Sequence, residues 1–221
     1  MINLPPTARV NRPLAKERFY QGVSGATKLK ELFTRDVERI RWGWKLSPKT
    51  VNFTAGGEVP EVEIFETTLS ARAVDERIVR AIDAAVKVTV LHVFTTARGV
   101  EAWFGYRLPD EKTRRYYHRD WRFATDFDLD LSANSADALC VSILRQLSEN
   151  RFEAKGDDTL KTALEKDARR IAKEKQLAAL KRKFKSERQM NRKYEIGRQI
   201  RELENLLVVG RRVPSPPQKG E

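Results

Sequence analysis

Residues 88–108, with the sequence VTVLHVFTTARGVEAWFGYRL, decide the fold class of this chain. Two runs rich in valine, threonine and aromatic residues flank a short segment that contains Gly99, which is the pattern of a β-hairpin. Side chains of these types pack well on the pleated surface of a sheet. The stretch therefore predicts two antiparallel strands.

The segments on either side of this hairpin predict more strands and two helices. VEIFETTL at 62–69 and RRYYHRDWRF at 114–123 have the composition of strands. VDERIVRAIDAAV at 74–86 and SADALCVSILRQL at 135–147 repeat apolar residues at helical spacing, and Ser135 is a candidate N-cap. Strands outnumber helices, so we expect an α+β fold with a mostly antiparallel sheet and packed helices.

The N-terminal quarter predicts an arm, a helix and a strand. Prolines at positions 5, 6 and 13 predict an extended arm over the first two dozen residues. In ATKLKELFTRDVERI, residues 26–40, five apolar side chains share one helical face, and Thr27 is the candidate N-cap. These five are Leu29, Leu32, Phe33, Val37 and Ile40. RWGWKLSPKTVNF at 41–53 then leads into a strand.

The C-terminal third differs from the rest in charge and periodicity. Residues 1–150 hold 23 Lys/Arg and 20 Asp/Glu, whereas residues 151–221 hold 20 and 11, so most of the net charge of +12 lies there. Such an excess favours an anionic partner. We expect a globular domain over 1–150, a long charged helix over 151–208 and a disordered Pro-rich tail over 209–221. A helix of that length must project from the domain or fold back on itself.

A basic face on this helix is the candidate binding site. On a continuous helix, Lys181, Lys185, Arg188 and Arg192 would fall on one side, because 3.6 residues make a turn. The candidate nucleic-acid-binding residues are Lys181, Arg182, Lys185, Arg188, Arg192 and Lys193. An acidic protein is the alternative partner. Two short apolar registers that are out of phase, one from Leu177 and one from Ile196, favour a short helix pairing, including a homodimer, over a long coiled coil.

No enzyme signature is present in the sequence. It contains no P-loop, no Gly-rich dinucleotide turn and no spaced Cys/His cluster, so we expect no catalytic residue, metal site or cofactor. His92 and Cys140 lie in apolar stretches and are predicted to be buried. Asp126, Asp128 and Asp130 resemble the start of a calcium loop, but Leu131 stands where glycine is needed, so a half-buried strand is favoured.

A metal-dependent nuclease is the catalytic alternative. It would place carboxylates and a lysine on neighbouring strands to hold a metal ion and activate water. Glu61, Glu63 and Glu66 on one predicted strand and Glu101 on another are the available acids. No lysine follows them in the required spacing, so we expect no nuclease activity.

The sequence also predicts the compartment. Its start lacks the apolar segment of a secretory signal, and no apolar run approaches the roughly 20 residues that a membrane span needs. A single cysteine excludes an intramolecular disulfide. We expect a cytoplasmic protein with no membrane contact.

Three stretches resemble a bacterial family of unknown function, DUF4391. They are VERIRWGWKLSPKTVNF at 37–53, DERIVRAIDAAVKVTVLHVF at 75–94 and ERQMNRKYEIGRQIRELENLL at 187–207. Tyr194 and Gly197 depart from the family's aliphatic or polar pattern. The resemblance brings no catalytic residues. It implies a gene beside helicases and DNA methyltransferases in restriction or phage-defence loci.

Together these observations lead to one functional expectation. The protein is expected to be a non-enzymatic accessory subunit of a DNA-acting restriction or phage-defence complex. Its basic helix would bind the phosphate backbone of DNA or RNA, or a helicase or methyltransferase partner. The nuclease and a purely structural homodimer formed through the helix are the alternatives.

Overall fold

The fold was obtained as a computed structural model. It describes residues 2, 4–21, 25–54, 57–107, 114–149, 151, 152, 154 and 158–209. The chain divides into two compact units, 1–161 and 162–221. The predicted Pro-rich tail lies outside the described residues except for Val209.

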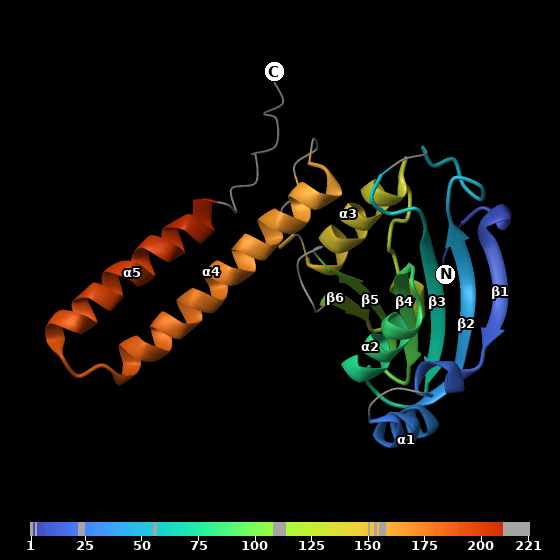
Figure 1. The fold of residues 1–221 in the computed structure, drawn as a ribbon, viewed down its shortest axis with the longest axis horizontal. Coiled ribbons are helices and arrows are strands. Elements are labelled where there is room, and N and C mark those ends of the chain that lie inside the picture. Colours follow the sequence, from blue (N-terminus) through green and yellow to red (C-terminus); the bar gives the residue numbers. More distant parts are fainter. Residues whose placement is uncertain are drawn as a thin grey trace. The chain divides into compact units, whose positions relative to one another are not determined.

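The first unit is built on a six-stranded sheet (Figure 1). The strands are β1 (Arg9–Leu14), β2 (Val37–Leu46), β3 (Val62–Leu69), β4 (Thr89–Thr96), β5 (Gly99–Tyr106) and β6 (Arg115–Trp121), and they lie in sequence order. All neighbours are antiparallel except β3 and β4, which are parallel. A parallel pair needs a crossover, and α2 (Glu76–Ala85) provides it. The expected α+β fold with a mostly antiparallel sheet is confirmed.

Helices cover both faces of the sheet. The main core lies on one face, where α1 (Ala26–Asp36), α2 and the short 3-10 helix η2 (Lys16–Phe19) pack. Fully buried Phe33, Ile78 and Phe94 belong to this core. Strand residues that point to the other face, such as Ile64, Leu91 and Phe104, are buried as well. On that side, α3 (Ala136–Leu147) contacts β5 and β6. Sidedness of this kind follows from the two-residue period of strands.

The expected N-terminal arm is partly wrong. Residues 9–14 form the edge strand β1, paired antiparallel with β2. Pro13 is compatible with this position because an edge strand leaves half of its N–H groups without a ladder partner. The register shifts between Arg9 and Arg12, and Asn11 has a φ of 54°, so the strand carries an irregularity that obscured it in the sequence.

The expected helix over 26–40 is too long. α1 ends at Asp36, and Val37 and Ile40 belong to β2. The pairing of β2 with β3 is irregular at two places, and every third residue of β2 is buried as a result: Val37, Ile40, Gly43 and Leu46. Bulges insert a residue and shift the side-chain alternation. The resulting three-residue spacing imitates the period of a helix.

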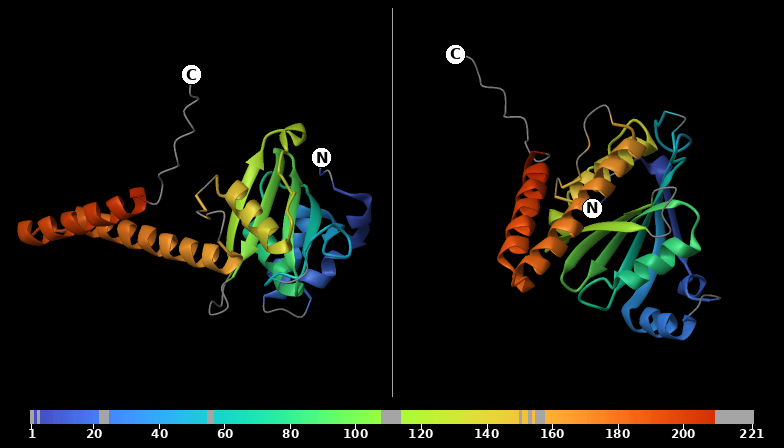
Figure 2. Two further views of the ribbon diagram at one scale, coloured as in Figure 1. Left: turned by 90° about the horizontal axis from the view of Figure 1, so that it is seen from above. Right: turned by 60° about the vertical axis from the view of Figure 1, so that its left-hand side comes forward.

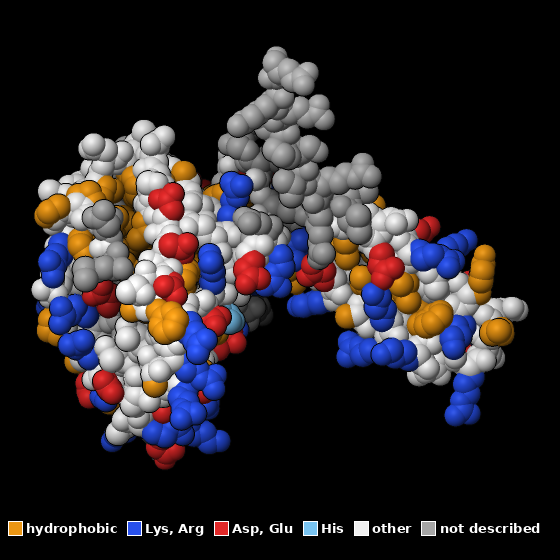
Figure 3. All heavy atoms as spheres, turned by 180° about the vertical axis from the view of Figure 1, so that it is seen from behind, with side chains coloured by type: hydrophobic (Ala, Val, Ile, Leu, Met, Phe, Trp, Pro, Cys, Tyr) orange, Lys and Arg blue, Asp and Glu red, His pale blue; other side chains and the backbone are white. Residues whose placement is uncertain are grey.

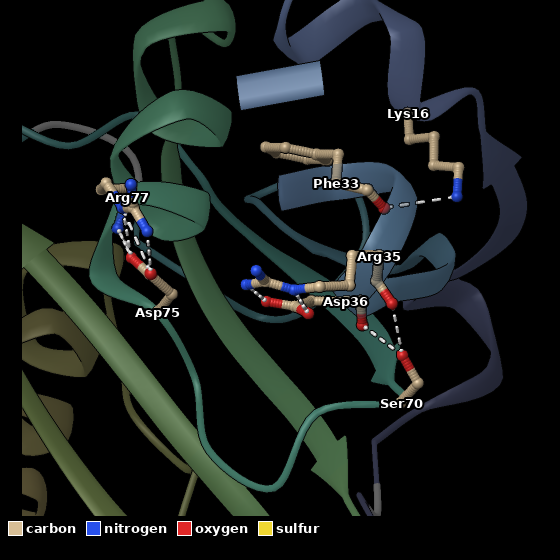
Figure 4. Close-up of polar contacts among 7 residues, drawn as sticks. All are labelled: Lys16, Phe33, Arg35, Asp36, Ser70, Asp75 and Arg77. Carbon is tan, nitrogen blue, oxygen red and sulfur yellow. Dashed lines mark hydrogen bonds and ion pairs between the residues drawn. The ribbon is translucent and has the colours of Figure 1, made fainter. Parts of the chain in front are cut away.

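The two ends of α1 differ from the expectation as well. Gly25, with a φ of 78°, occupies the N-cap position, and Thr27 lies inside the helix. At the C-terminal end, Lys16 Nζ donates to the carbonyl oxygens of Phe33 (3.4 Å) and Val37 (2.8 Å), and Figure 4 shows the first of these bonds. A cation at this end of α1 complements the helix dipole.

Polar side chains cap or pair with residues at the end of α1 and at the starts of α2 and α3. Asp36 is buried and accepts two hydrogen bonds from Arg35, at 2.6 and 2.8 Å (Figure 4). These bonds lower the pKa of Asp36 more than its burial raises it. Asp75 caps α2 by accepting from the Arg77 amide at 2.9 Å. Ser135 caps α3 in the same way, through Ala138 N at 3.1 Å, so that prediction is confirmed.

The second unit is a helical hairpin instead of one long helix. α4 (Leu160–Ser186) and α5 (Met190–Val209) lie antiparallel, side by side (Figures 1 and 2). The helices are connected by residues 187–189, where the Glu187 carboxylate accepts from the amides of Arg188 and Gln189, both at 2.9 Å. The continuous helix expected over 151–208 is therefore wrong. The chain folds back on itself, which was the other arrangement expected for a helical segment of this length.

Contacts between α4 and α5 explain the two apolar registers. Lys181 and Glu204 form an ion pair of 2.6 Å, and Lys193 Nζ lies 5.1 Å from the ring centre of Phe184. Apolar residues of both registers are buried or half-buried; they are Leu177, Leu180 and Phe184 on α4 and Ile196, Ile200, Leu203 and Leu207 on α5. These residues of the two registers lie on different helices, which is why they are out of phase. The first register was expected to continue to Tyr194, but Tyr194 lies on α5 and is 70% exposed. α4 and α5 pair with each other within one chain, and pairing with a second chain stays a prediction.

Candidate functional site

The helix break changes the geometry of the predicted binding residues. Lys181, Arg182 and Lys185 lie on α4, Arg188 lies in the connection, and Arg192 and Lys193 lie on α5. The four cations expected in a row along one helix therefore do not form a row. Those nearest the connection gather instead where the hairpin turns.

The predicted cations differ in how they are engaged. Lys181 is paired with Glu204, and Lys193 lies over the ring of Phe184. Arg182, Lys185, Arg188 and Arg192 are exposed, and no ion pair holds them in the described part of the chain. Lys183, which was not among the candidates, is exposed in the same way. These five side chains are available to a ligand.

Two large side chains are exposed among these cations. Met190 is 80% exposed and Tyr194, one turn further along α5, is 70% exposed. Figure 3 shows lysine and arginine side chains interspersed with apolar ones over this unit. We define the hairpin tip as Lys183, Lys185, Arg188, Met190, Arg192 and Tyr194. A surface that combines cations with an aromatic ring suits a polyanion whose bases can stack.

The carboxylates of the nuclease alternative do not converge. Glu63 and Glu66 point to opposite faces of β3, since they are three residues apart. Glu101 accepts hydrogen bonds from Val74 N and Trp103 Nε1, at 3.3 and 3.2 Å. Across the described ranges, no three His, Cys, Asp or Glu side chains are placed to hold a metal ion.

One observation nevertheless corrects the reasoning against a nuclease. Lys45 of β2 forms an ion pair of 2.6 Å with Glu61, and its register partner in β3 is Glu63. A lysine on a neighbouring strand is thus present, although no sequence spacing announced it. Glu63 is 7% exposed, and burial, followed by the charge of Glu61, raises the pKa of Glu63 to about 7.

The other candidate residues have structural positions. Cys140 is buried, as predicted, and burial raises the pKa of its thiol far above the usual range. The strand predicted over the three aspartates is wrong: Ala124–Asp126 is a 3-10 turn, and the residues from 127 to 131 form no strand. Asp128 accepts from Trp121 Nε1 at 2.8 Å, and Asp130 accepts from Ser132 N at 2.8 Å.

A buried polar cluster was not foreseen. His92 is fully buried, as predicted, and its Nε2 lies 2.8 Å from Asp83 Oδ1. Tyr116 donates its hydroxyl to Asp83 Oδ2 at 2.9 Å, and Arg114 Nε lies 3.9 Å from the same oxygen. Burial by itself would raise the pKa of Asp83, but His92, Arg114 and Tyr116 together lower it. Burial and the neighbouring Asp83 raise the pKa of Tyr116, which keeps the phenol protonated.

Fold and surface together define an α+β protein with a mixed sheet and a cationic helical hairpin. The family described as Domain of unknown function (DUF4391) matches residues 2–207, so the chain belongs to this family. No curated protein and no solved structure matches the chain. Among the described residues, no helix is both long and apolar enough to cross a membrane.

Proposed function

We propose that the protein is a non-enzymatic accessory subunit of a bacterial DNA-acting restriction or phage-defence complex, and that the hairpin tip binds the nucleic-acid backbone. The observation that carries the proposal is the set of exposed cations around Met190 and Tyr194 that have no ion pair in the described chain. Neutralising about five phosphates would make affinity fall roughly 10²- to 10³-fold between 50 and 200 mM salt. Backbone contacts of this kind carry no base sequence information.

Charge reversal at the tip tests this proposal. The triple variant Lys185→Glu, Arg188→Glu and Arg192→Glu should abolish binding of labelled single- and double-stranded DNA and RNA, measured by fluorescence anisotropy at several salt concentrations. All three side chains are exposed, so the hairpin should still fold, which circular dichroism checks. If the unaltered protein binds none of these nucleic acids, the proposal is wrong.

A matched control separates the tip from the overall charge. Lys28, Lys30 and Lys49 are exposed in the first unit and have no ion pair in the parts that the structure describes. Reversing these three to glutamate changes the net charge by the same amount. Binding should survive in this control. Equal losses in both triple variants would indicate nonspecific attraction to a basic protein, and loss of partner-protein capture alone would favour an acidic protein as the ligand.

The pair of Lys45 with Glu61 beside Glu63 favours a second candidate, the metal-dependent nuclease. Lys45 of β2, Glu63 of β3 and Glu61, the residue before β3, bring together residue types that can bind a metal ion and activate water. Incubating the protein with DNA and RNA in the presence of magnesium or manganese tests this directly. Cleavage that is lost in both Glu63→Gln and Lys45→Met would replace the accessory role with a catalytic one.

A further inference from the structure

A second concentration of cations lies on the first unit. A pocket of about 540 Å³ opens between the end of α2 and the adjoining ends of β5 and β6. Its charged and hydrogen-bonding lining consists of Arg80, Asp83, Lys87, Arg107, Arg114 and Tyr116. Four cations and one acid therefore face the same space.

The single acid does not neutralise these cations. Both carboxylate oxygens of Asp83 are already engaged, one with His92 and the other with the Tyr116 hydroxyl. Arg114 is the only pocket cation within 4 Å of Asp83, and its Nε is 3.9 Å away. Lys87 and Arg107 are exposed and have no ion pair within the described ranges. The pocket keeps an excess of positive charge.

Arg80 is held in a defined position beside the pocket. Its Nη2 donates to Glu76 Oε1 at 2.6 Å, and its guanidinium carbon lies 5.0 Å from the ring centre of Tyr116. Tyr116 is itself fixed by its hydrogen bond to Asp83. Tyr116 thus links this wall of the pocket to the buried Asp83.

The helix dipole explains only part of this charge. A cation just after the C-terminus of α2, such as Lys87, stabilises the helix end. Arg107 and Arg114 follow β5 and precede β6, so they do not belong to a helix end. Like-charged side chains brought together on a surface repel one another, and an anion relieves this repulsion.

We propose that this pocket binds a phosphate monoester group, with Arg107 and Arg114 as its main ligands and with Arg80 and Lys87 completing the cationic wall. Guanidinium groups match the oxygens of phosphate in bidentate geometry, and they bind it more directionally than ammonium groups do. The volume lies within the usual range for small-molecule sites and leaves room for the group that carries the phosphate. This site does not depend on the proposed role of the hairpin tip.

Titration calorimetry of the full chain tests the site with defined probes. Inorganic phosphate and a nucleoside 5′-monophosphate represent small ligands, with the unphosphorylated nucleoside as the negative probe. A short oligonucleotide with a 5′-phosphate, compared with its 5′-hydroxyl form, represents a nucleic-acid end. Phosphate-dependent binding of any of these probes supports the site, and their relative affinities identify the source of the phosphate. Absence of binding by all of them overturns the proposal.

Two exposed residues provide the variant and one provides the control. The double variant Lys87→Gln and Arg107→Gln should weaken binding of the best phosphate probe at least tenfold, because it removes two of the four cations that would make charge-assisted hydrogen bonds to the phosphate. Both side chains are exposed, so the fold should be unaffected. Arg72→Gln, at another exposed arginine, should bind as the unaltered protein does. Unchanged affinity in the double variant, or an equal loss in Arg72→Gln, overturns the proposal.

Charge reversal at the hairpin tip distinguishes the pocket from the tip as the site that binds the phosphate monoester. The triple variant at Lys185, Arg188 and Arg192 should keep its affinity for the phosphate monoester while losing binding of long nucleic acid. Loss of both together would mean that the monoester binds at the hairpin, and the pocket would not be the site.

Discussion

Lys181 of α4 and Glu204 of α5 are joined by an ion pair of 2.6 Å, which links two segments that are 23 positions apart in the sequence. The pair removes one of the predicted binding cations from the set available to a ligand. It also distinguishes Lys181 from Lys185, which lies one turn further along α4 and has no such partner in the described chain.

This difference predicts unequal effects of two similar substitutions. Lys185→Gln should reduce the salt dependence of nucleic-acid binding, lowering the slope of log affinity against log salt by about 0.9, as expected for one lost phosphate contact. Lys181→Gln should leave that slope unchanged, because its ammonium group is already paired. Anisotropy titrations from 50 to 200 mM salt measure both slopes. Equal slopes for the two variants would show that the ion pair with Glu204 does not keep Lys181 from contacting phosphate.

Gly197 makes a second prediction for the hairpin. A methyl group at this position would lie 3.4 Å from a ring carbon of Phe184, which is a tolerable contact, and the residue has no positive φ. Alanine is favoured over glycine inside helices by about 1 kcal/mol. Gly197→Ala should therefore stabilise the hairpin by about that amount in urea unfolding followed by helical circular dichroism. Destabilisation would mean that Phe184 needs the open space.

The contrast between α3 and β2 shows what the sequence makes predictable. α3 was predicted with its cap, because Ser135 and the apolar residues after it act within a few positions of one another. β2 was misread at its start because two irregularities in its pairing with β3 gave it a three-residue burial period. Those irregularities depend on β3, whose paired residues lie 20 to 32 positions further along the chain, so local periodicity does not contain them.

The candidate sites also differed in how far they could be predicted, because residues close together in the sequence are easier to recognise than residues that only the fold brings together. Lys185, Arg188 and Arg192 of the hairpin tip were selected as candidates because they lie close together in a segment rich in cations, whereas Lys183 was not. Their arrangement was not predicted, since no glycine or proline marks the break between α4 and α5 at residues 187–189. His92, Asp83 and Tyr116 come from three different elements, and only the folded sheet brings them together.

Capping by Ser135 makes a prediction for the first unit. Ser135→Ala should destabilise it by about 1 kcal/mol, because the Ala138 amide loses its acceptor at the start of α3. Ser135→Asp should restore most of the loss, since aspartate is also a preferred N-cap residue. Thermal unfolding of the three proteins measures this. An equal loss in Ser135→Asp would indicate that the hydroxyl has another role.

The raised pKa of Glu63 predicts a pH-dependent effect on stability. Between an ordinary value of 4.5 and about 7, only the unfolded state is ionised at this position, so the native state loses stability as the pH rises through this window. Above pH 7 the cost is complete and reaches at most about 3 kcal/mol, at 1.36 kcal/mol for each pKa unit. Glu63→Gln removes this cost. Its free energy of unfolding, relative to the unaltered protein, should therefore be higher at pH 8 than at pH 4.5.

Urea unfolding at these two pH values gives the comparison. The matched control is Glu38→Gln, at an exposed position of β2. If both variants change by the same amount between pH 4.5 and 8, burial of Glu63 is not the cause.

Asp83 and Tyr116 should be energetically coupled, because the phenol donates to a carboxylate that is buried in the protein. Tyr116→Phe leaves an acceptor of Asp83 unsatisfied and should cost about 1–3 kcal/mol. Asp83→Asn should cost more, since it also changes the partner of fully buried His92. In the double variant, the phenylalanine no longer leaves a charged acceptor unsatisfied. The loss of stability of the double variant should therefore be smaller than the sum of the two single losses by about 0.5–3 kcal/mol. A double-mutant cycle by urea unfolding measures this difference. Losses that add to within about 0.5 kcal/mol would show that the two residues act independently and that the cluster does not hold Tyr116 in place.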